Sequence, residues 1–331
     1  MTTRATALVE SPLQLLGTLE AVHAGVVPAP VEVRWRSTVP GLRAAVAAVG
    51  ELGAEALPPG IVLVAAGRPS ARDLPSRDRD HAVGDVFSGR AQVGLAAARP
   101  GRLVLLDDGL ATIEAVRLLG GGGPLVRLGR SARAPRRLLG ARVSRRIRTL
   151  AARPGRVVLC TALDLAPADA VALDGLGIEV TRHAFGWVAG LPPAPAVPEP
   201  LVVVGSALVA DGLVDPDAYV RWVAALADAA DGGTCYIPHR RHDAGVLARL
   251  AALPGVRVAP PGPPVELRLR SLDPSQRVVC LPSTAHRFLR QVLRGSGARV
   301  ELADVPAHWW TERADARLRD HLVAAAAGED R

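Results

Sequence analysis

Short runs of valine, leucine and isoleucine recur along the chain, separated by longer segments whose apolar positions lie three and four residues apart. We expect strands in the first half at residues 6–9, 31–36, 61–65, 102–106, 156–160 and 178–181. We expect helices between them at residues 12–23, 42–52 and 110–119. Apolar runs that are bounded by turns and separated by helices are typical of parallel strands buried on both faces. The first half therefore predicts an α/β domain with a doubly wound sheet.

The pattern is interrupted at residues 191–200, where LPPAPAVPEP holds five prolines. Proline fixes φ and lacks an amide donor, so this segment is expected to be a semi-rigid linker. Beyond it we expect strands at 201–204, 234–237, 256–258, 277–281 and 299–302, and helices at 215–230, 244–253, 284–294 and 312–327. The chain thus predicts two Rossmann-like domains, 1–190 and 201–331, with a cleft between them and a last helix that could cross back.

Ligands of open parallel sheets bind beyond the carboxyl ends of the strands, so polar residues directly after the predicted strands are the candidates for function. Ser11 follows the first strand and precedes a proline, which is an ordinary helix start. Gln14 is not explained by that start, and it lies one turn into a helix whose N-terminus could bind an anion. Asp107 and Asp108 follow the strand at 102–106 and precede a glycine. They fit either a turn with an N-cap or a general base whose neighbour's charge raises its proton affinity.

Two strand ends of the second half could bind phosphate. His239 and Arg240 are either surface charge or an anion site, since arginine holds phosphate in a bidentate geometry and histidine donates a proton near neutral pH. Ser283 and Thr284 open a helix, either as a plain N-cap or as hydroxyls that hold phosphate together with free amides. His239 and His242 lie three residues apart, but arginines separate them and no third ligand is nearby, so no metal is expected.

The 331 residues carry a formal net charge of +8, and all 40 basic residues are arginine. Arginine in place of lysine, with abundant alanine, glycine and proline, is typical of a GC-rich genome, so the charge alone does not indicate a polyanionic partner. Aromatic residues make up only 3% of the chain, which disfavours a nucleic-acid partner. The segment from Arg127 to Arg148 holds nine arginines and no acid. It could be a solvated surface or a mobile loop, or it could make peripheral contact with an anionic membrane or another polyanion.

Other features narrow the class of protein. The 3 cysteines are far apart, which disfavours zinc and iron–sulfur sites and indicates buried thiols in a reducing compartment. We find no signal peptide and no apolar run approaching the roughly 18–20 residues of a membrane span. We therefore expect a cytoplasmic protein, at most peripheral at the inner face of the cell membrane. The motifs GxxxxGK[ST], GxGxxG, GxSxG and HExxH are absent, which disfavours the enzymes that use them.

Taken in order, the four strand ends resemble the motifs of the lipooligosaccharide-type bacterial sialyltransferases, glycosyltransferase family 52. They resemble those of the bacterial polysialyltransferases more distantly. The resemblance extends over residues 8–290. The residues that carry it are, in chain order, SPLQLL at 11–16 with Glu20 one turn later, Asp107-Asp108-Gly109, His239, and Ser283-Thr284. The chain departs from the family's His-Pro motif, because Arg240 follows the histidine.

The resemblance implies a GT-B fold and a metal-independent, inverting transfer of sialic acid or a related sugar from a CMP-activated donor to a cell-surface glycan. It implies that Asp107 is the base that takes the acceptor's proton and that Asp108 supports it. His239 would contact or protonate the departing phosphate, which Ser283 and Thr284 would hold. The expected partners are a nucleotide-sugar donor and a glycan acceptor, without a cofactor.

The remaining candidates belong to the donor side. Arg240 stands where the family has its proline and could supply a contact to the donor there, and Ser11 and Gln14 are expected to bind the donor or its phosphate. Two alternatives stay open. The first is a GT-B transferase that uses a nucleoside-diphosphate sugar, and the second is a non-catalytic binder of polyanions or membrane surfaces through the arginine segment.

Overall fold

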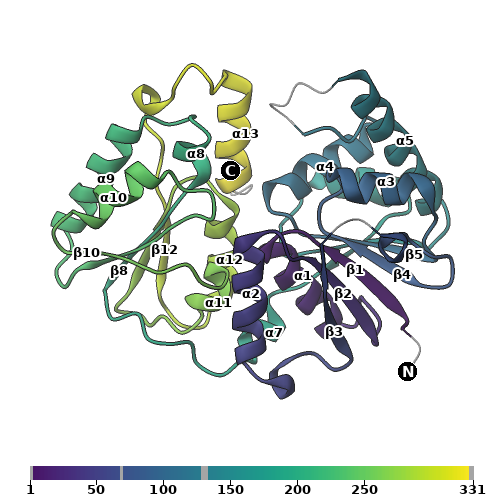
Figure 1. The fold of residues 1–331 in the computed structure, drawn as a ribbon. Coiled ribbons are helices and arrows are strands. Elements are labelled where there is room, and N and C mark those ends of the chain that lie inside the picture. The colour runs from purple at the N-terminus through teal and green to yellow at the C-terminus, as the bar shows by residue number, and fades with distance from the viewer. Residues whose placement is uncertain (1–2, 68–69, 128–132, 328–331) are drawn as a thin grey trace. The chain divides into compact units, whose positions relative to one another are not determined.

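The computed structural model describes residues 3–67, 70–127 and 133–327, and the chain divides into two compact units. Unit 1 is Met1–Leu191 and unit 2 is Pro192–Arg331, so the boundary falls where the proline-rich segment begins. Each unit is built on one parallel sheet with helices packed against it (Figure 1). The chain is therefore an α/β protein with two Rossmann-like sheets, as the hydrophobic pattern predicts.

Unit 1 holds a seven-stranded sheet in the order β3-β2-β1-β4-β5-β6-β7, with every neighbouring pair parallel. Its strands are β1 (Ala5–Val9), β2 (Val31–Arg36), β3 (Ile61–Ala66), β4 (Asp80–Val83), β5 (Arg102–Leu106), β6 (Val157–Thr161) and β7 (Glu179–Arg182). The strand order reverses between β1 and β4. In open α/β sheets such a reversal opens a crevice at the carboxyl ends of the strands, where ligands bind.

The helices of unit 1 are α1 (Pro12–His23), α2 (Pro40–Glu51), α3 (Gly89–Ala97), α4 (Leu110–Gly120), α5 (Ala134–Ala151), α6 (Pro167–Gly175) and α7 (Gly186–Ala189). Helices α3, α4 and α5 cover one face, where they pack on Leu103 and Leu105 of β5 and on Leu159 of β6. Helix α1 packs on β5 and β6 as well. At Gly17 the helix faces the end of β5, where a Cβ would lie 3.9 Å from the Leu106 Cβ, an ordinary van der Waals distance.

Unit 2 holds a five-stranded parallel sheet in the order β10-β9-β8-β11-β12. Its strands are β8 (Leu201–Val204), β9 (Thr234–Ile237), β10 (Val256–Val258), β11 (Arg277–Cys280) and β12 (Arg299–Leu302). Its helices are α8 (Ala207–Ala210), α9 (Pro216–Asp228), α10 (Ala244–Ala251), α11 (Val265–Arg268), α12 (Thr284–Val292) and α13 (Ala316–Ala327).

The unbroken valine run of β8 is explained by its position in the middle of this sheet. Successive side chains of a strand point to opposite faces. Leu201 and Val203 join the cluster that includes residues of α9 and α10, whereas Val202 and Val204 join the one that includes residues of α12. Because both faces are covered by helices, both sets of positions must be apolar, and the strand shows no alternation of polar and apolar residues.

Every predicted strand is present, with ends within one residue of those expected, and the described part of the chain contains one further strand that was not predicted. The strand β4 (Asp80–Val83) is only 4 residues long and begins with Asp-His, so it offers no apolar run to detect. The arginine segment contains a second difference. Residues 134–151 form the helix α5, which buries Val143 and Ile147, so the mobile-loop interpretation is wrong there. Residues 128–132 of that segment lie outside the described residues.

One buried cluster of ions in unit 1 contributes to stability and lies away from the strand ends described below. Asp73 accepts hydrogen bonds from Arg34 Nε at 2.7 Å and from Arg90 Nη2 at 2.6 Å, and all three side chains are less than 10% exposed. Burial raises the pKa of Asp73, but the bonds from the two arginines outweigh it, and the net effect is a lowered pKa. Asp73 is therefore held as a carboxylate between two buried cations.

Candidate functional site

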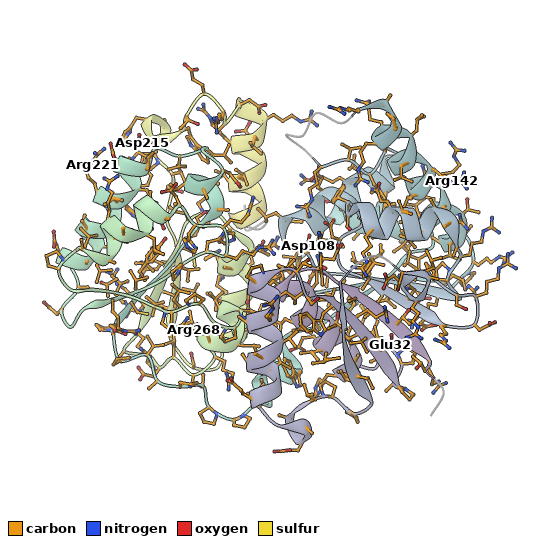
Figure 2. The ribbon with its side chains drawn as sticks, viewed as in Figure 1. Glu32, Asp108, Arg142, Asp215, Arg221 and Arg268 are labelled. Carbon is orange, nitrogen blue, oxygen red and sulfur yellow. The ribbon has the colours of Figure 1, made fainter. Side chains whose placement is uncertain are left out.

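The carboxyl edge of the unit 1 sheet gathers polar side chains from five neighbouring strand ends. Ser11 and Gln14 follow β1, Asp85 follows β4, Asp107 and Asp108 follow β5, Thr161 ends β6, and His183 follows β7. These positions flank the reversal of strand order, where an open α/β sheet binds its ligand. Figure 2 marks Asp108 at this edge of the sheet.

Asp108 is the hub of a hydrogen-bonded network at this edge. Its Oδ1 accepts from Gln14 Nε2 at 2.9 Å and from Ser11 Oγ at 3.4 Å, while its Oδ2 accepts from Arg127 at 2.8 Å. The same Arg127 nitrogen donates to Asp85 at 2.9 Å. Burial lowers the pKa of Arg127, but the charges of the two aspartates outweigh it and raise the pKa overall. Arg127 is therefore a fixed cation between two carboxylates.

Two glycines make this network geometrically feasible. Gln14 crosses directly over Gly84, since a Cβ on that glycine would lie 2.2 Å from the Gln14 Cγ. Gly109 caps α4 with φ 70° and ψ −141°, a conformation that is essentially restricted to glycine. The acidic-acidic-Gly motif thus has a structural reason for its third residue, which turns the chain from β5 into α4 and leaves Asp108 at the strand end.

Asp107 lies in a different environment from its neighbour. It is 2% exposed, and its two oxygens accept hydrogen bonds from Thr161 Oγ1 at 2.5 Å and from the Ala162 amide at 2.6 Å. His183 Nε2 lies 3.6 Å from Asp107 Oδ2, and His183 Nδ1 lies 4.0 Å from Glu20 Oε2. Asp107 is thereby held rigidly against β6, beside a buried imidazole.

His183 is a candidate that the sequence analysis missed. Both its ring nitrogens are buried and have no hydrogen-bond partner within the described residues, although two carboxylates flank the ring. Glu20, only 1% exposed, accepts from the Trp187 and Val188 amides at the start of α7. Glu20 therefore ties α1 to the segment that carries the histidine. The rule that found the other candidates, a polar residue just after a strand, also applies to His183, because β7 ends at Arg182.

In unit 2, His239 follows β9 in a tight loop. Its Nδ1 lies 3.1 Å from the Arg241 amide nitrogen and 3.3 Å from the Arg241 carbonyl oxygen. In the tautomer that accepts from the amide, Nε2 carries the proton and is suited to donate to an anion. Burial, together with the charges of Arg240 and Arg241, lowers the pKa of His239 to about 4. Arg241 in turn pairs with Asp211 at 2.7 Å. The histidine is therefore neutral at pH 7 and presents a donor rather than a charge.

Gly205, at the carboxyl end of β8, allows this loop to approach the neighbouring strand. Its amide donates to the Ile237 carbonyl at 2.8 Å. A Cβ at Gly205 would lie 2.7 Å from the Tyr236 hydroxyl and 2.8 Å from the His239 amide nitrogen, closer than real contacts allow. The glycine is therefore required for the position of His239, although the sequence alone gave it no role.

Ser283 follows β11 and occupies the N-cap position of α12, as predicted. Its hydroxyl makes no capping hydrogen bond, unlike the N-cap side chains of Ser11 on α1 and Asp215 on α9. Thr284 is the first residue of the helix and is half-buried. The start of α12 thus combines the positive end of a helix with an N-cap hydroxyl that is not used as a cap, which suits an anion site.

The predicted site residues thus fall into two sets. In unit 1 the structure brings Ser11, Gln14 and Asp108 into one hydrogen-bonded network, with Asp107 beside them. Ser11 and Gln14 are 3% and 2% exposed, so their side chains hold Asp108, and their expected contact with a donor stays a prediction. In unit 2, His239 and Ser283 each lie two or three residues beyond the end of a strand of one parallel sheet, with Arg240 exposed next to the histidine.

Two classes of feature are not found in the part of the chain that the structure describes. No group of three or more histidine, cysteine, aspartate or glutamate side chains is placed to hold a metal ion. No helix among residues 3–67, 70–127 and 133–327 combines the length and the apolar character needed to cross a membrane.

Comparisons by sequence give no relatives. No model of a known protein family matches the chain. A search of curated proteins also finds no match.

Comparison by structure gives a clear likeness. The α/β-galactoside α-2,3-sialyltransferase of the luminous marine bacterium Photobacterium phosphoreum superposes with a TM-score of 0.52 at 8% identity, covering 98% of this chain and 95% of that one. The heptosyltransferase WaaC of E. coli with ADP superposes with a TM-score of 0.39 at 12% identity, covering 92% of this chain and 94% of that one. At such low identity the first likeness establishes the fold, which is GT-B.

Proposed function

We propose that the chain is a glycosyltransferase that moves sialic acid, or a related sugar, from a CMP-activated donor to a glycan acceptor. One observation carries the proposal: two complementary chemistries lie at the carboxyl edges of the two sheets. Unit 1 offers adjacent aspartates after β5, and unit 2 offers His239 after β9 and a helix start led by the Ser283 hydroxyl after β11. The fold shared with a bacterial sialyltransferase and the order of the four motifs support the same conclusion.

The unit 2 residues suit a departing CMP. When the bond from the sugar to the phosphate breaks, negative charge concentrates on the phosphate, so donors that are already in position stabilise the transition state. The neutral His239 ring donates from Nε2, and the start of α12 supplies the Ser283 hydroxyl and the positive end of the helix. A nucleoside monophosphate carries less charge than a diphosphate, so we propose that these groups suffice without a metal.

The unit 1 residues suit the acceptor. We propose that Asp107 takes the proton of the attacking hydroxyl, and that Asp108, fixed by Gln14 and Arg127, orients the sugar or the base. The hydrogen bonds from Thr161 and the Ala162 amide hold Asp107 in one orientation, so little entropy is lost when the carboxylate is aligned with the attacking hydroxyl.

The donor can be tested without knowing the acceptor. We expect CMP to raise the melting temperature more than UDP or GDP, and CMP-sialic acid to be hydrolysed slowly by the enzyme, with EDTA present, in the absence of acceptor. A shift with UDP or GDP and none with CMP would instead support a nucleoside-diphosphate donor. Activity that disappears with EDTA and returns with a divalent cation would refute the metal-independent mechanism.

Two variants test the roles. Asp107→Asn should lower transfer by about 10²–10⁴-fold while donor affinity changes little, because general base catalysis supplies that factor. His239→Ala should weaken CMP binding and slow donor hydrolysis. Arg249→Gln, an exposed change in unit 2, serves as the control and should retain both properties. If Asp107→Asn keeps full transfer while Asp108→Asn loses it, the two aspartates have exchanged roles.

A further inference from the structure

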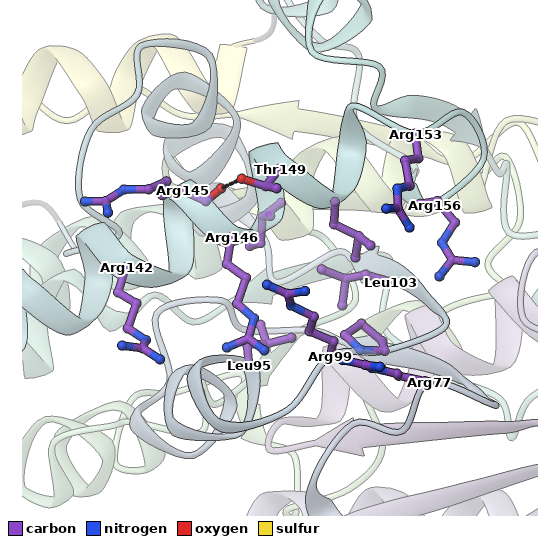
Figure 3. Close-up of a pocket in the computed structure, with 13 residues that line it drawn as sticks. Arg77, Leu95, Arg99, Leu103, Arg142, Arg145, Arg146, Thr149, Arg153 and Arg156 are labelled. Carbon is purple, nitrogen blue, oxygen red and sulfur yellow. Dashed lines mark hydrogen bonds between the residues drawn. The ribbon is translucent and has the colours of Figure 1, made fainter.

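A second site candidate lies in unit 1 at the opposite end of β5 from Asp107. It is a pocket of about 570 Å³ next to the first residues of β5 and β6, where α5 passes the connection between α3 and β5 (Figure 3). This volume lies within the range of about 300–1,000 Å³ that is usual for small-molecule sites. The buried side chains of Leu95, Leu103 and Ile147 close its base.

Arginines from four separate parts of unit 1 converge on this pocket. Arg77 precedes β4, Arg99 precedes β5, three arginines come from α5, and two come from the loop between α5 and β6. Among the residues that the structure describes, no carboxylate lines the pocket. Figure 3 shows Arg146 extending from α5 toward Arg99. Only the fold brings together segments so far apart in sequence. The cluster therefore includes arginines from outside the arginine-rich segment 127–148 as well as from within it.

These cations have not found acidic partners. Within the described residues, none of the seven arginines forms an ion pair, whereas Arg34 and Arg127 in the same unit each bind two carboxylates. The Nε atoms of Arg146 and Arg156 are buried and also lack a hydrogen-bond partner. A GC-rich composition explains why a basic residue is arginine, but it does not explain why seven arginines without ion pairs surround one hollow.

The arrangement costs the free protein electrostatic energy. Burial lowers the pKa of Arg146, and the positive charges of Arg99, Arg142 and Arg77 lower it further. Clustered like charges destabilise the compact state through mutual repulsion. An anion in the pocket would relieve this repulsion.

We propose that this pocket binds an anion that carries two or more phosphoryl groups. Guanidinium groups match phosphate oxygens in a bidentate geometry, and seven of them exceed what one phosphate can engage. The phosphoryl groups can belong to a free small molecule or to lipid headgroups. The proposal does not depend on the proposed transfer reaction, because the pocket and Asp107 lie at opposite ends of β5.

Inorganic tripolyphosphate is the soluble probe, measured by isothermal titration calorimetry on the full chain. We expect saturable one-to-one binding that weakens as salt rises. The double variant Arg99→Gln/Arg142→Gln should weaken it about tenfold or more, since it removes two charge-assisted contacts. The control Arg43→Gln/Arg221→Gln removes the same charge from exposed positions outside the pocket and should change binding less than about twofold.

Vesicles of phosphatidylglycerol and phosphatidylcholine distinguish the two sources of phosphate. Lipid headgroups bind in the pocket if three results are obtained together: vesicles bind the wild type, vesicles do not bind the Arg99→Gln/Arg142→Gln variant, and tripolyphosphate displaces the wild type from vesicles. If tripolyphosphate binds and vesicles do not, the ligand is a free anion. Absence of tripolyphosphate binding, or equal weakening in the pocket and control variants, would overturn the proposal. If the first pair fails to fold, Arg77→Gln/Arg153→Gln provides the same test at the other side of the pocket.

Discussion

The histidine after β9 should remain neutral at pH 7 until an anion binds beside it. Burial and the charges of Arg240 and Arg241 lower the pKa of His239 from 6.5 to about 4. At pH 7 only about one molecule in a thousand then carries a charged ring. A phosphate near the ring favours the charged form and raises the pKa in the complex. Binding therefore takes up a proton in the pH range between the free and the bound pKa.

The sign of the pH dependence follows from this difference. Between pH 4 and the bound pKa, the contribution of His239 to the association constant for CMP should fall as pH rises, by up to about tenfold, or about 1.4 kcal/mol, per pH unit. This contribution is the difference between wild type and His239→Gln, because both proteins share the ionisation of the CMP phosphate, whose second pKa is about 6. Arg241→Gln should raise the free pKa of His239, because it removes one neighbouring charge and releases Asp211 from its ion pair. The dependence should then begin at a higher pH.

The measurement combines two methods. The NMR titration of the ring protons, assigned by their loss in His239→Gln, gives the free pKa, and calorimetry with CMP between pH 5 and 8 gives the affinity. Arg249→Gln breaks an equally exposed ion pair, to Asp217 at 2.7 Å, and should leave the titration unchanged. A free pKa near 6.5, or one that Arg241→Gln does not raise, would refute the argument from burial and neighbouring charge.

Three further substitutions test other parts of the structure. Gly205→Ala should lower CMP affinity by calorimetry about tenfold or more, because its Cβ would collide with the backbone of His239; unchanged affinity would contradict the role given to the glycine. Asp73→Asn should cost about 3 kcal/mol in urea unfolding, since it removes the carboxylate partner of the buried Arg90, whereas Arg34 keeps its ion pair with Glu32. The lowered pKa of Asp73 means that this stabilisation is present above about pH 4 and is lost as pH falls, so the two proteins should converge in acid. His183→Gln should lower kcat about tenfold with little change in the donor KM if the ring positions Asp107, whereas equal loss of stability and activity would indicate a structural role alone.

The hydrophobic pattern predicted the sheets well because their strands are continuous apolar runs. A strand covered on both faces, such as β8, must be apolar at every position, and that requirement is visible in the sequence. The strand β4 was missed because its first residues are polar: Asp80 is half-buried at the start of the strand, and buried His81 pairs with the hydroxyl of Thr6. A tertiary hydrogen bond of this kind leaves no periodic trace.

The site was predicted in outline, because strand ends can be located from the pattern and polar residues there are conspicuous. The hydrogen bonds and ion pairs between the site residues could not be predicted. Arg127 reaches Asp85 and Asp108 across 42 and 19 residues of sequence, and only the folded chain brings these charges together. The arginine-lined pocket at the amino ends of β5 and β6 could not be predicted for the same reason. Arg77 and Arg99 belong to different loops, and only the packing of the folded chain brings them next to α5.

The two adjacent aspartates after β5 have different surroundings. Successive residues leaving a strand point in different directions, so the neighbours enter different surroundings. Asp107 turns to β6 and meets neutral donors, while Asp108 turns to α1 and meets the cation of Arg127. The proposed division of roles follows these surroundings, with the proton taken by Asp107 and the positioning done by Asp108. Arg127→Gln removes a partner of Asp108 and none of the hydrogen bonds to Asp107, so under this proposal it should disturb the positioning of the substrate more than the orientation of the base.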